Sequence, residues 1–210
     1  MIAPAILVNN LEDFFKQAKK MEKIFDYAQI DIMDGIFVPN ISFAGIEKIN
    51  DLKLKLKFEL HLLVEHPLAE MEKWKNIKNV FRVIFPIECK DDIAETIKFC
   101  RDSGWQAGIA LNPETPLTAA EPYYKLIDMV LFMTVHPGQQ GAPFLPEVGQ
   151  KIKEFTRLEK RPICAVDGGI RAENIAMVKS WGVEIFNIGS ALVMADDLDQ
   201  AYQNLQKQIK

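Results

Sequence analysis

Two stretches, Ala28-Gln-Ile-Asp-Ile-Met-Asp-Gly35 and Ile163-Cys-Ala-Val-Asp-Gly-Gly169, place a carboxylate where a largely apolar run ends. Short runs of this kind are typical of strands that are buried on both faces. A carboxylate at the C-terminal end of such a strand is badly placed for stability and well placed for chemistry. Asp31 and Asp167 therefore point both to a fold and to a site.

Strand-like and helix-like segments alternate along the whole chain. Amphipathic segments such as the one that carries Leu11, Phe14 and Ala18 behind an Asn10 N-cap predict helices. Eight strands, each followed by a helix or a helix-sized gap, predict an α/β fold, a (β/α)8 TIM barrel, as a single domain over residues 1–210. A doubly wound open sheet is the alternative, but no Gly-x-Gly-x-x-Gly follows the first strand. The predicted strands are residues 2–7, 27–31, 58–63, 80–85, 107–111, 129–135, 163–166 and 185–188.

Composition narrows the class of protein. The chain has 210 residues, is 49% hydrophobic and carries a formal net charge of −4, which gives no electrostatic case for binding nucleic acid or an anionic membrane. No apolar run is long enough to cross a bilayer, and the N-terminus lacks the pattern of a signal peptide. The cysteines Cys89, Cys100 and Cys164 have no metal or redox spacing. We expect a cytoplasmic protein with reduced cysteines, and a homo-oligomer stays open.

Polar residues at strand ends suggest the chemistry. In a barrel, such side chains face one shared pocket. Asp31 and Asp167 could flank one bound carbon, remove a proton from one face and return it to the other. A divalent metal between them would stabilise an enediolate, and His61 offers a nitrogen ligand. Asp34 and Asn40 are predicted to shape the turn after the second strand.

Glycine-rich loops follow the sixth, seventh and eighth strands. Glycine lets backbone N–H groups approach a phosphate closely, and the loops after strands seven and eight are the usual phosphate site of such barrels. We therefore expect a phosphorylated small molecule as the partner. The loop residues concerned are Gly138, Gly141, Gly168, Gly169, Gly189 and Ser190.

The motif Asp31-Ile-Met-Asp-Gly-Ile-Phe-Val-Pro-Asn40 resembles the signature of ribulose-phosphate 3-epimerases. Leu111-Asn-Pro-Glu-Thr-Pro116 also fits, and is similar to the related allulose-6-phosphate 3-epimerases. The matches extend from the first predicted strand to the last. Further segments match the family in order: Glu59-Leu-His-Leu-Leu-Val64, Met133-Thr-Val-His-Pro-Gly138, Val166-Asp-Gly-Gly-Ile170 and Asn187-Ile-Gly-Ser-Ala191.

The resemblance implies an isomerase of the pentose phosphate pathway that inverts the third carbon of a ketopentose phosphate, D-ribulose 5-phosphate to D-xylulose 5-phosphate. It implies that Asp31 and Asp167 are the acid/base pair and that, with His61, they hold one divalent metal ion (Zn, Mn, Fe or Mg). Met33 and Met133 would form part of a wall beside the enediolate. The glycine-rich loops and Ser190 would surround the phosphate of the sugar.

Several positions depart from the family pattern. Gln29 stands where the family has a metal-binding histidine, and its neutral amide suits a hydrogen-bonded pocket role as well as it suits metal ligation. As a ligand it predicts weaker zinc affinity and a relative shift towards Mn²⁺ or Mg²⁺. Ala5 replaces a serine, Leu63 a methionine and Pro86 a histidine, and residues 138–141 lack one glycine and an aromatic. Two alternatives stay open: a 3-epimerase of a ketohexose 6-phosphate such as allulose 6-phosphate, and a non-catalytic sugar-phosphate-binding homologue.

Overall fold

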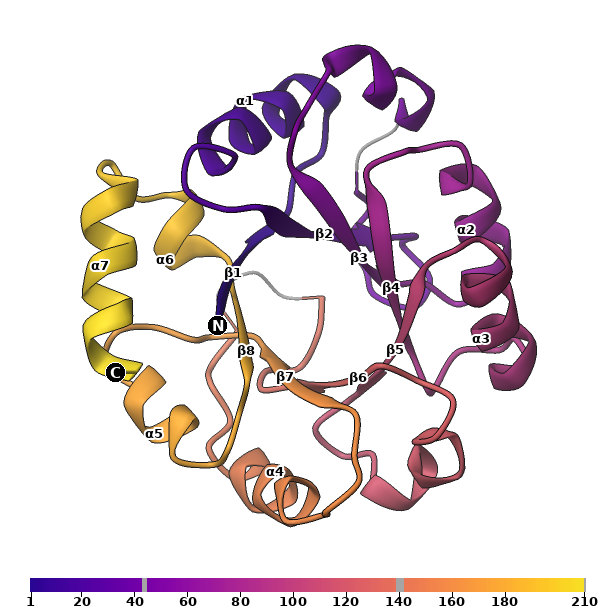
Figure 1. The fold of residues 1–210 in the computed structure, drawn as a ribbon, viewed down its shortest axis with the longest axis vertical. Coiled ribbons are helices and arrows are strands. Elements are labelled where there is room, and N and C mark those ends of the chain that lie inside the picture. Colours follow the sequence, from indigo (N-terminus) through magenta and orange to yellow (C-terminus); the bar gives the residue numbers. More distant parts are fainter. Residues whose placement is uncertain (43–44, 139–141, 210) are drawn as a thin grey trace.

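Eight parallel strands, hydrogen-bonded in chain order, close into a barrel that helices surround (Figure 1). The structure is a computed structural model, and it describes residues 1–42, 45–138 and 142–209. The predicted (β/α)8 TIM barrel is confirmed, and seven of the eight strands differ from the prediction at one end only, by one or two residues. The strands are β1 (Ile2–Ile6), β2 (Tyr27–Met33), β3 (Lys57–Leu63), β4 (Val80–Pro86), β5 (Gln106–Leu111), β6 (Met129–Met133), β7 (Ile163–Asp167) and β8 (Ile185–Ile188).

The connections differ in regularity. Helix α1 begins where Asn10 accepts a hydrogen bond from the backbone N–H of Asp13, which confirms the predicted N-cap. Within the described residues, the connections after β2 and β5 carry 3₁₀ helices, η1 (Ile46–Leu52), η2 (Leu117–Ala119) and η3 (Glu121–Tyr123). The α-helices are α1 (Leu11–Met21), α2 (Pro67–Trp74), α3 (Ile93–Asp102), α4 (Val148–Thr156), α5 (Ile175–Lys179), α6 (Ser190–Val193) and α7 (Leu198–Ile209).

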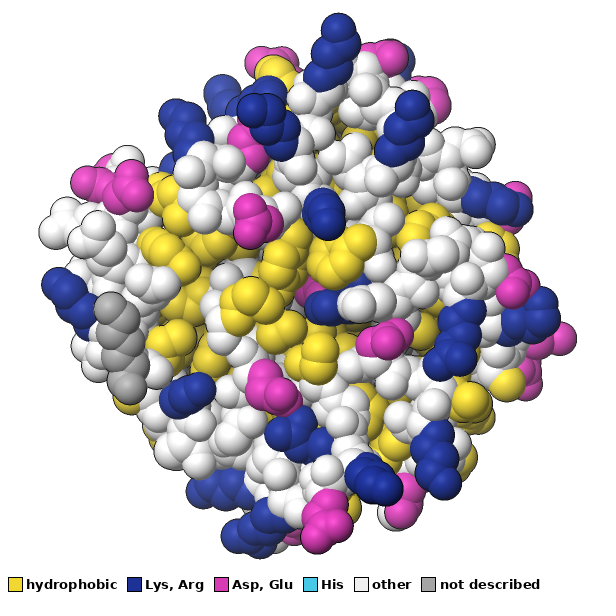
Figure 2. All heavy atoms as spheres, viewed as in Figure 1, with side chains coloured by type: hydrophobic (Ala, Val, Ile, Leu, Met, Phe, Trp, Pro, Cys, Tyr) yellow, Lys and Arg dark blue, Asp and Glu magenta, His cyan; other side chains and the backbone are white. Residues whose placement is uncertain are grey.

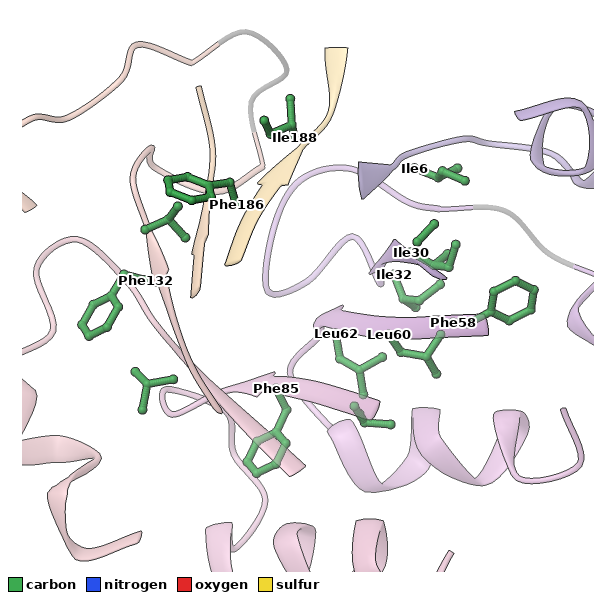
Figure 3. Close-up of a cluster of buried hydrophobic side chains, with 14 of the residues drawn as sticks. Ile6, Ile30, Ile32, Phe58, Leu60, Leu62, Phe85, Phe132, Phe186 and Ile188 are labelled. Atoms are coloured by element: carbon green, nitrogen blue, oxygen red, sulfur yellow. The ribbon is translucent and has the colours of Figure 1, made fainter. Parts of the chain in front are cut away.

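The alternation of side chains along each strand creates two cores. Outward-facing side chains pack against the helices in one large buried cluster, and Figure 3 shows Ile30, Phe58 and Phe132 in this layer. A smaller apolar cluster lies inside the barrel and includes Met129 and Leu131. The inside positions of β2, β3 and β8 carry polar side chains instead, and these form the floor of the site described below.

The surface is mixed in charge. Figure 2 shows acidic and basic side chains spread around the rim of one face, with apolar side chains towards its centre. Within the described part of the chain, none of the helices is both long and apolar enough to cross a membrane.

Candidate active site

Strand register brings the predicted polar residues together. Asp31 on β2 lies opposite His61 on β3, and Asp167 at the end of β7 lies opposite Asn187 on β8. All four occupy inward positions, because the outward positions between them carry the apolar residues that face the helices. The side chains therefore meet near the C-terminal ends of the strands, inside the barrel.

Asp31, His61 and Asp167 form one compact group. His61 Nδ1 lies 3.1 Å from Asp31 Oδ1 and 3.3 Å from Asp167 Oδ2. The His61 side chain is fully buried, whereas those of Asp31 and Asp167 keep 14% and 11% exposure. Both carboxylates are thus open to a small molecule, and the imidazole lies beneath them.

Burial and mutual repulsion govern the ionisation of this group. Burial raises the pKa of Asp31, and the nearby negative charge of Asp167 raises it further. Burial alone would lower the pKa of His61, but hydrogen bonds to Asp167 and Asp31 outweigh burial and raise that pKa to about 10. Without a metal, the imidazole therefore supplies positive charge between the two carboxylates, and it would have to release that proton to bind a metal.

The same three residues fit a divalent cation. One ligand atom from each, two carboxylate oxygens and an imidazole nitrogen, lie within 4.8 Å of one another. Two carboxylate oxygens and one imidazole nitrogen make a common donor set for Zn²⁺ and Mn²⁺, and three protein ligands leave coordination positions for water or substrate. Asp31, His61 and Asp167 could therefore hold a metal without further protein ligands.

Gln29 joins this group through its amide nitrogen. Its Nε2 donates to Asp31 Oδ1 at 2.8 Å and to Asp167 Oδ2 at 2.6 Å. Its Oε1 faces the opposite way and accepts a hydrogen bond from Asn187 Nδ2 at 2.5 Å. The amide is fully buried, and its nitrogen rather than its oxygen faces the two carboxylates.

A cavity of about 270 Å³ opens above the carboxylates and extends over the loops after β7 and β8. Its lining includes Asp31, Asp167 and four of the predicted phosphate-loop residues, Gly168, Gly169, Gly189 and Ser190. Gly168 has a φ of +111°, and a Cβ there would lie 2.5 Å from Val135, so only glycine lets this loop pass so close to the loop after β6.

A smaller cavity, of about 100 Å³, adjoins the first and shares Asp31, Asp167 and Gly168 with it. Its lining includes Met33, Met133 and Gly138, which places the two predicted methionines beside the carboxylates, together with Leu63. Asn40 Nδ2 donates to the carbonyl of Gly138 at 2.7 Å, which ties the loop after β2 to the loop after β6. The predicted phosphate contact at Gly141 lies outside the described residues.

Sequence reasoning missed several residues of the site. Arg171 lines the larger cavity directly after the Gly168–Gly169 turn, and its position in the chain could have indicated it. Gln17 also lines that cavity, from helix α1, which the strand-end rule does not cover. Glu59 and Arg82 are buried in the barrel interior and connect to Asn187 through hydrogen bonds. Glu59 alternates with His61 along β3, which could have indicated it, whereas no local sequence signal marks Arg82.

Comparison with known proteins gives the family. The model of the ribulose-phosphate 3 epimerase family matches residues 1–193. The ribulose-phosphate 3-epimerase of Chlamydia pneumoniae is 32% identical to this chain, and the match covers 94% of the chain and 90% of the relative. That of Bacillus subtilis (strain 168) is 31% identical, with 98% and 97% covered.

Solved structures share the fold at lower identity. A 3-hexulose-6-phosphate synthase superposes with a TM-score of 0.73 at 18% identity, covering 100% of this chain and 99% of that one. An orotidine 5'-phosphate decarboxylase from Pyrococcus horikoshii OT3 gives 0.69 at 15% identity, with the same coverage. At such identity the likeness concerns the barrel alone. The family match and the curated relatives decide the assignment: the chain belongs to the ribulose-phosphate 3-epimerase family and is an isomerase that acts on carbohydrates.

Proposed function

We propose that the protein interconverts D-ribulose 5-phosphate and D-xylulose 5-phosphate by two-base proton transfer at the third carbon. The observation that carries this proposal is the convergence of Asp31 and Asp167, from β2 and β7, on one cavity. In that arrangement one carboxylate removes the proton from one face of the carbon. The other carboxylate delivers a proton to the opposite face.

The surroundings of the two carboxylates suit this role. Burial and the charge of Asp167 raise the pKa of Asp31, which makes its carboxylate a stronger base than an exposed one. Met33 and Met133 give the reacting carbon an apolar wall that excludes water. A divalent metal bound by Asp31, His61 and Asp167 would supply positive charge that stabilises the enediolate.

The phosphate end of the substrate belongs in the larger cavity. Gly168, Gly169 and Gly189 bring the backbone close to this space, and Ser190 adds a hydroxyl group. Arg171 lines the same space and supplies a positive charge that complements a phosphate dianion. With the phosphate there, a five-carbon chain extends from the loops towards Asp31 and Asp167.

Solvent exchange tests the proposal. We expect deuterium from D₂O to enter the third carbon of ribulose 5-phosphate when Zn²⁺, Mn²⁺ or Mg²⁺ is supplied. Asp31→Asn and Asp167→Asn should each slow this exchange by about 10²-fold or more, because each removes one of the two proton carriers. Asp92→Asn is the matched control. Asp92 is the N-cap of α3, and asparagine is an equally good N-cap residue, so this variant should leave exchange unchanged.

Allulose 6-phosphate in the same assay distinguishes a ketohexose substrate. Faster exchange with this sugar than with ribulose 5-phosphate would replace the pentose in the proposal. Absence of exchange with both sugars and all three metals would refute an epimerase activity.

A further inference from the structure

A line of buried polar side chains runs through the barrel interior to the site. Arg82 Nη1 on β4 donates to Glu59 Oε2 on β3 at 2.5 Å, and this ion pair is almost completely buried. Asn187 Nδ2 on β8 donates to Glu59 Oε1 at 3.3 Å and to Gln29 Oε1 at 2.5 Å. Gln29 then donates from Nε2 to the two carboxylates at the surface of the cavity.

The chemistry of the first members fixes the direction of every later hydrogen bond. A guanidinium group can only donate, so the Glu59 carboxylate accepts from it. Burial raises the pKa of Glu59, but the adjacent Arg82 guanidinium opposes this and favours the ionised form. The ionised carboxylate can only accept from its other neighbour, which makes Asn187 present its NH₂ group. The side-chain carbonyl oxygen of Gln29 must accept a hydrogen bond from that NH₂ group. The NH₂ group of Gln29 therefore faces Asp31 and Asp167.

We infer that Gln29 is a positioning residue that cross-links the two acid/base carboxylates as a hydrogen-bond donor, and that the Arg82–Glu59–Asn187 line keeps its oxygen away from the metal site. The inference rests on the acid/base roles proposed above for Asp31 and Asp167. It assigns to the position a role other than metal ligation, since an NH₂ group cannot coordinate a cation.

A cation and the Gln29 amide compete for the same atoms. The amide binds Asp31 Oδ1 and Asp167 Oδ2, and these two oxygens are also those nearest His61 Nδ1 in the candidate metal group. Gln29 Nε2 also lies 3.5 Å from His61 Nδ1, so a metal held by all three atoms would crowd this NH₂ group and displace one or both of its hydrogen bonds. The amide therefore holds the carboxylates together without a metal and lowers the affinity for one.

Mn²⁺ titration of the whole protein without sugar, followed by calorimetry, tests this competition. Gln29→Leu removes the amide, while Asn187 keeps Glu59 as a partner. We expect this variant to bind Mn²⁺ at least threefold more tightly than the original protein, because the competing donor is gone. If Gln29 were a ligand, the same substitution would weaken binding. Equal or weaker binding by Gln29→Leu overturns the inference, as does absence of Mn²⁺ binding in both proteins.

A second variant tests the line behind the amide. In Glu59→Gln the new side chain can accept a hydrogen bond from Arg82 and donate one to Asn187. The side-chain amide of Asn187 then turns over to accept that bond, and the amide of Gln29 turns over in response. The Gln29 oxygen would then face the metal site. We expect tighter Mn²⁺ binding here too, by at least threefold. Glu70→Gln is the matched control, because Glu70 is a buried glutamate on α2 that bonds Trp74 outside the barrel interior, and it should leave the affinity unchanged.

Unchanged affinity in Glu59→Gln, with the fold intact by circular dichroism, contradicts the orienting role of the line. The result is independent of the proposed function. Mn²⁺ affinity is measured without sugar, whereas the epimerase proposal stands or falls on deuterium exchange at the third carbon.

Discussion

At the scale of single residues, Asp34 lies close to the acid/base pair, but its carboxylate has a structural role. Its Oδ1 accepts from the backbone N–H groups of Ile36 and Phe37 at 2.8 and 2.9 Å, and its Oδ2 accepts from that of Glu65 at 2.7 Å. These bonds shape the turn after β2, as the sequence predicted, and tie it to the end of β3. Burial opposes ionisation, but the three backbone donors outweigh it and lower the pKa of Asp34 below 3.8.

Asp34→Asn should lower the free energy of unfolding at neutral pH by about 1–3 kcal/mol, because it removes charge-assisted hydrogen bonds to the backbone. Since the pKa of Asp34 is lowered by folding, its stabilising effect is present above the unfolded value of 3.8 and is lost as the pH falls through the folded value. Urea unfolding of both proteins over this range is the measurement. A difference between them that persisted undiminished at the acid end would contradict the assignment.

The orientation of side chains separates what sequence could predict from what it could not. Asp31, His61 and Asp167 follow from strand alternation and from their places near strand ends, so one rule places all three. The direction of the Gln29 amide depends on Glu59, 30 positions away in the chain, and on Arg82 and Asn187 beyond it. A hydrogen-bond direction set by residues on three other strands leaves no local pattern in the sequence.

Among the elements, helix α4 couples its packing to the site. Gly149 on α4 lies against Trp181, and a Cβ at Gly149 would lie 2.5 Å from Trp181 Cε2. The Trp181 ring stacks on Phe144 with 6.0 Å between centroids, and Phe144 lies against Gly169 of the candidate phosphate loop. A shift of α4 would therefore reach that loop through two aromatic rings.

Gly149→Ala should destabilise the protein by about 1–3 kcal/mol, because the added methyl group overpacks the contact with Trp181. Helix propensity alone predicts the opposite sign, since alanine is favoured over glycine in a helix. Thermal and urea unfolding give the sign. Gln150→Ala, at the exposed neighbouring position, should change stability by no more than about 0.5 kcal/mol. A stabilised Gly149→Ala protein would show that Trp181 has room to move.

The loop pair after β2 and β6 gives a second prediction for the elements. Gly138 has a φ of +92°, and a Cβ there would lie 2.8 Å from Val38. Gly138→Ala should separate the two loops and raise the KM for ribulose 5-phosphate by up to about tenfold, which corresponds to about 1.4 kcal/mol. The free energy of unfolding should fall by less than this 1.4 kcal/mol, because both loops lie outside the barrel core. Steady-state kinetics and urea unfolding, measured together, separate an effect on substrate binding from an effect on stability. An unchanged KM contradicts a role for this contact in substrate binding.

The regular elements were more predictable than the connections between them. Consecutive apolar residues predicted all eight strands, because both faces of a barrel strand are buried. The chain between β2 and β3 has no apolar stripe of helical spacing, and within its described residues it carries η1, whose one buried residue is Ile49. Such short 3₁₀ segments depend on tertiary contacts that no local pattern records.

Across the whole molecule, the barrel has an apolar layer outside its strands and a partly polar axis inside. Asn187, Glu59 and Arg82 connect the candidate site to the interior through hydrogen bonds. A buried ion pair such as Arg82–Glu59 adds little net stability relative to apolar side chains of similar volume, since both charges lose their hydration. Its effect is to fix the direction of the polar line that ends at Gln29.

Removing one partner of the ion pair, and then both, should separate the cost of an unpaired buried charge from the net stability that the pair contributes. Arg82→Met leaves the Glu59 carboxylate buried without its cation, and we expect the free energy of unfolding to fall by about 3–5 kcal/mol. The double variant Glu59→Leu/Arg82→Met removes both charges and should recover most of that loss, although Asn187 then keeps only Gln29 as its partner in the line. Urea unfolding of the three proteins gives the two differences. A double variant as unstable as Arg82→Met would mean that the pair itself, rather than the unpaired charge, stabilises the barrel.

Mn²⁺ titration of the double variant extends the test. Without the line the side-chain amide of Gln29 is free to turn, and the affinity for Mn²⁺ should exceed that of the original protein.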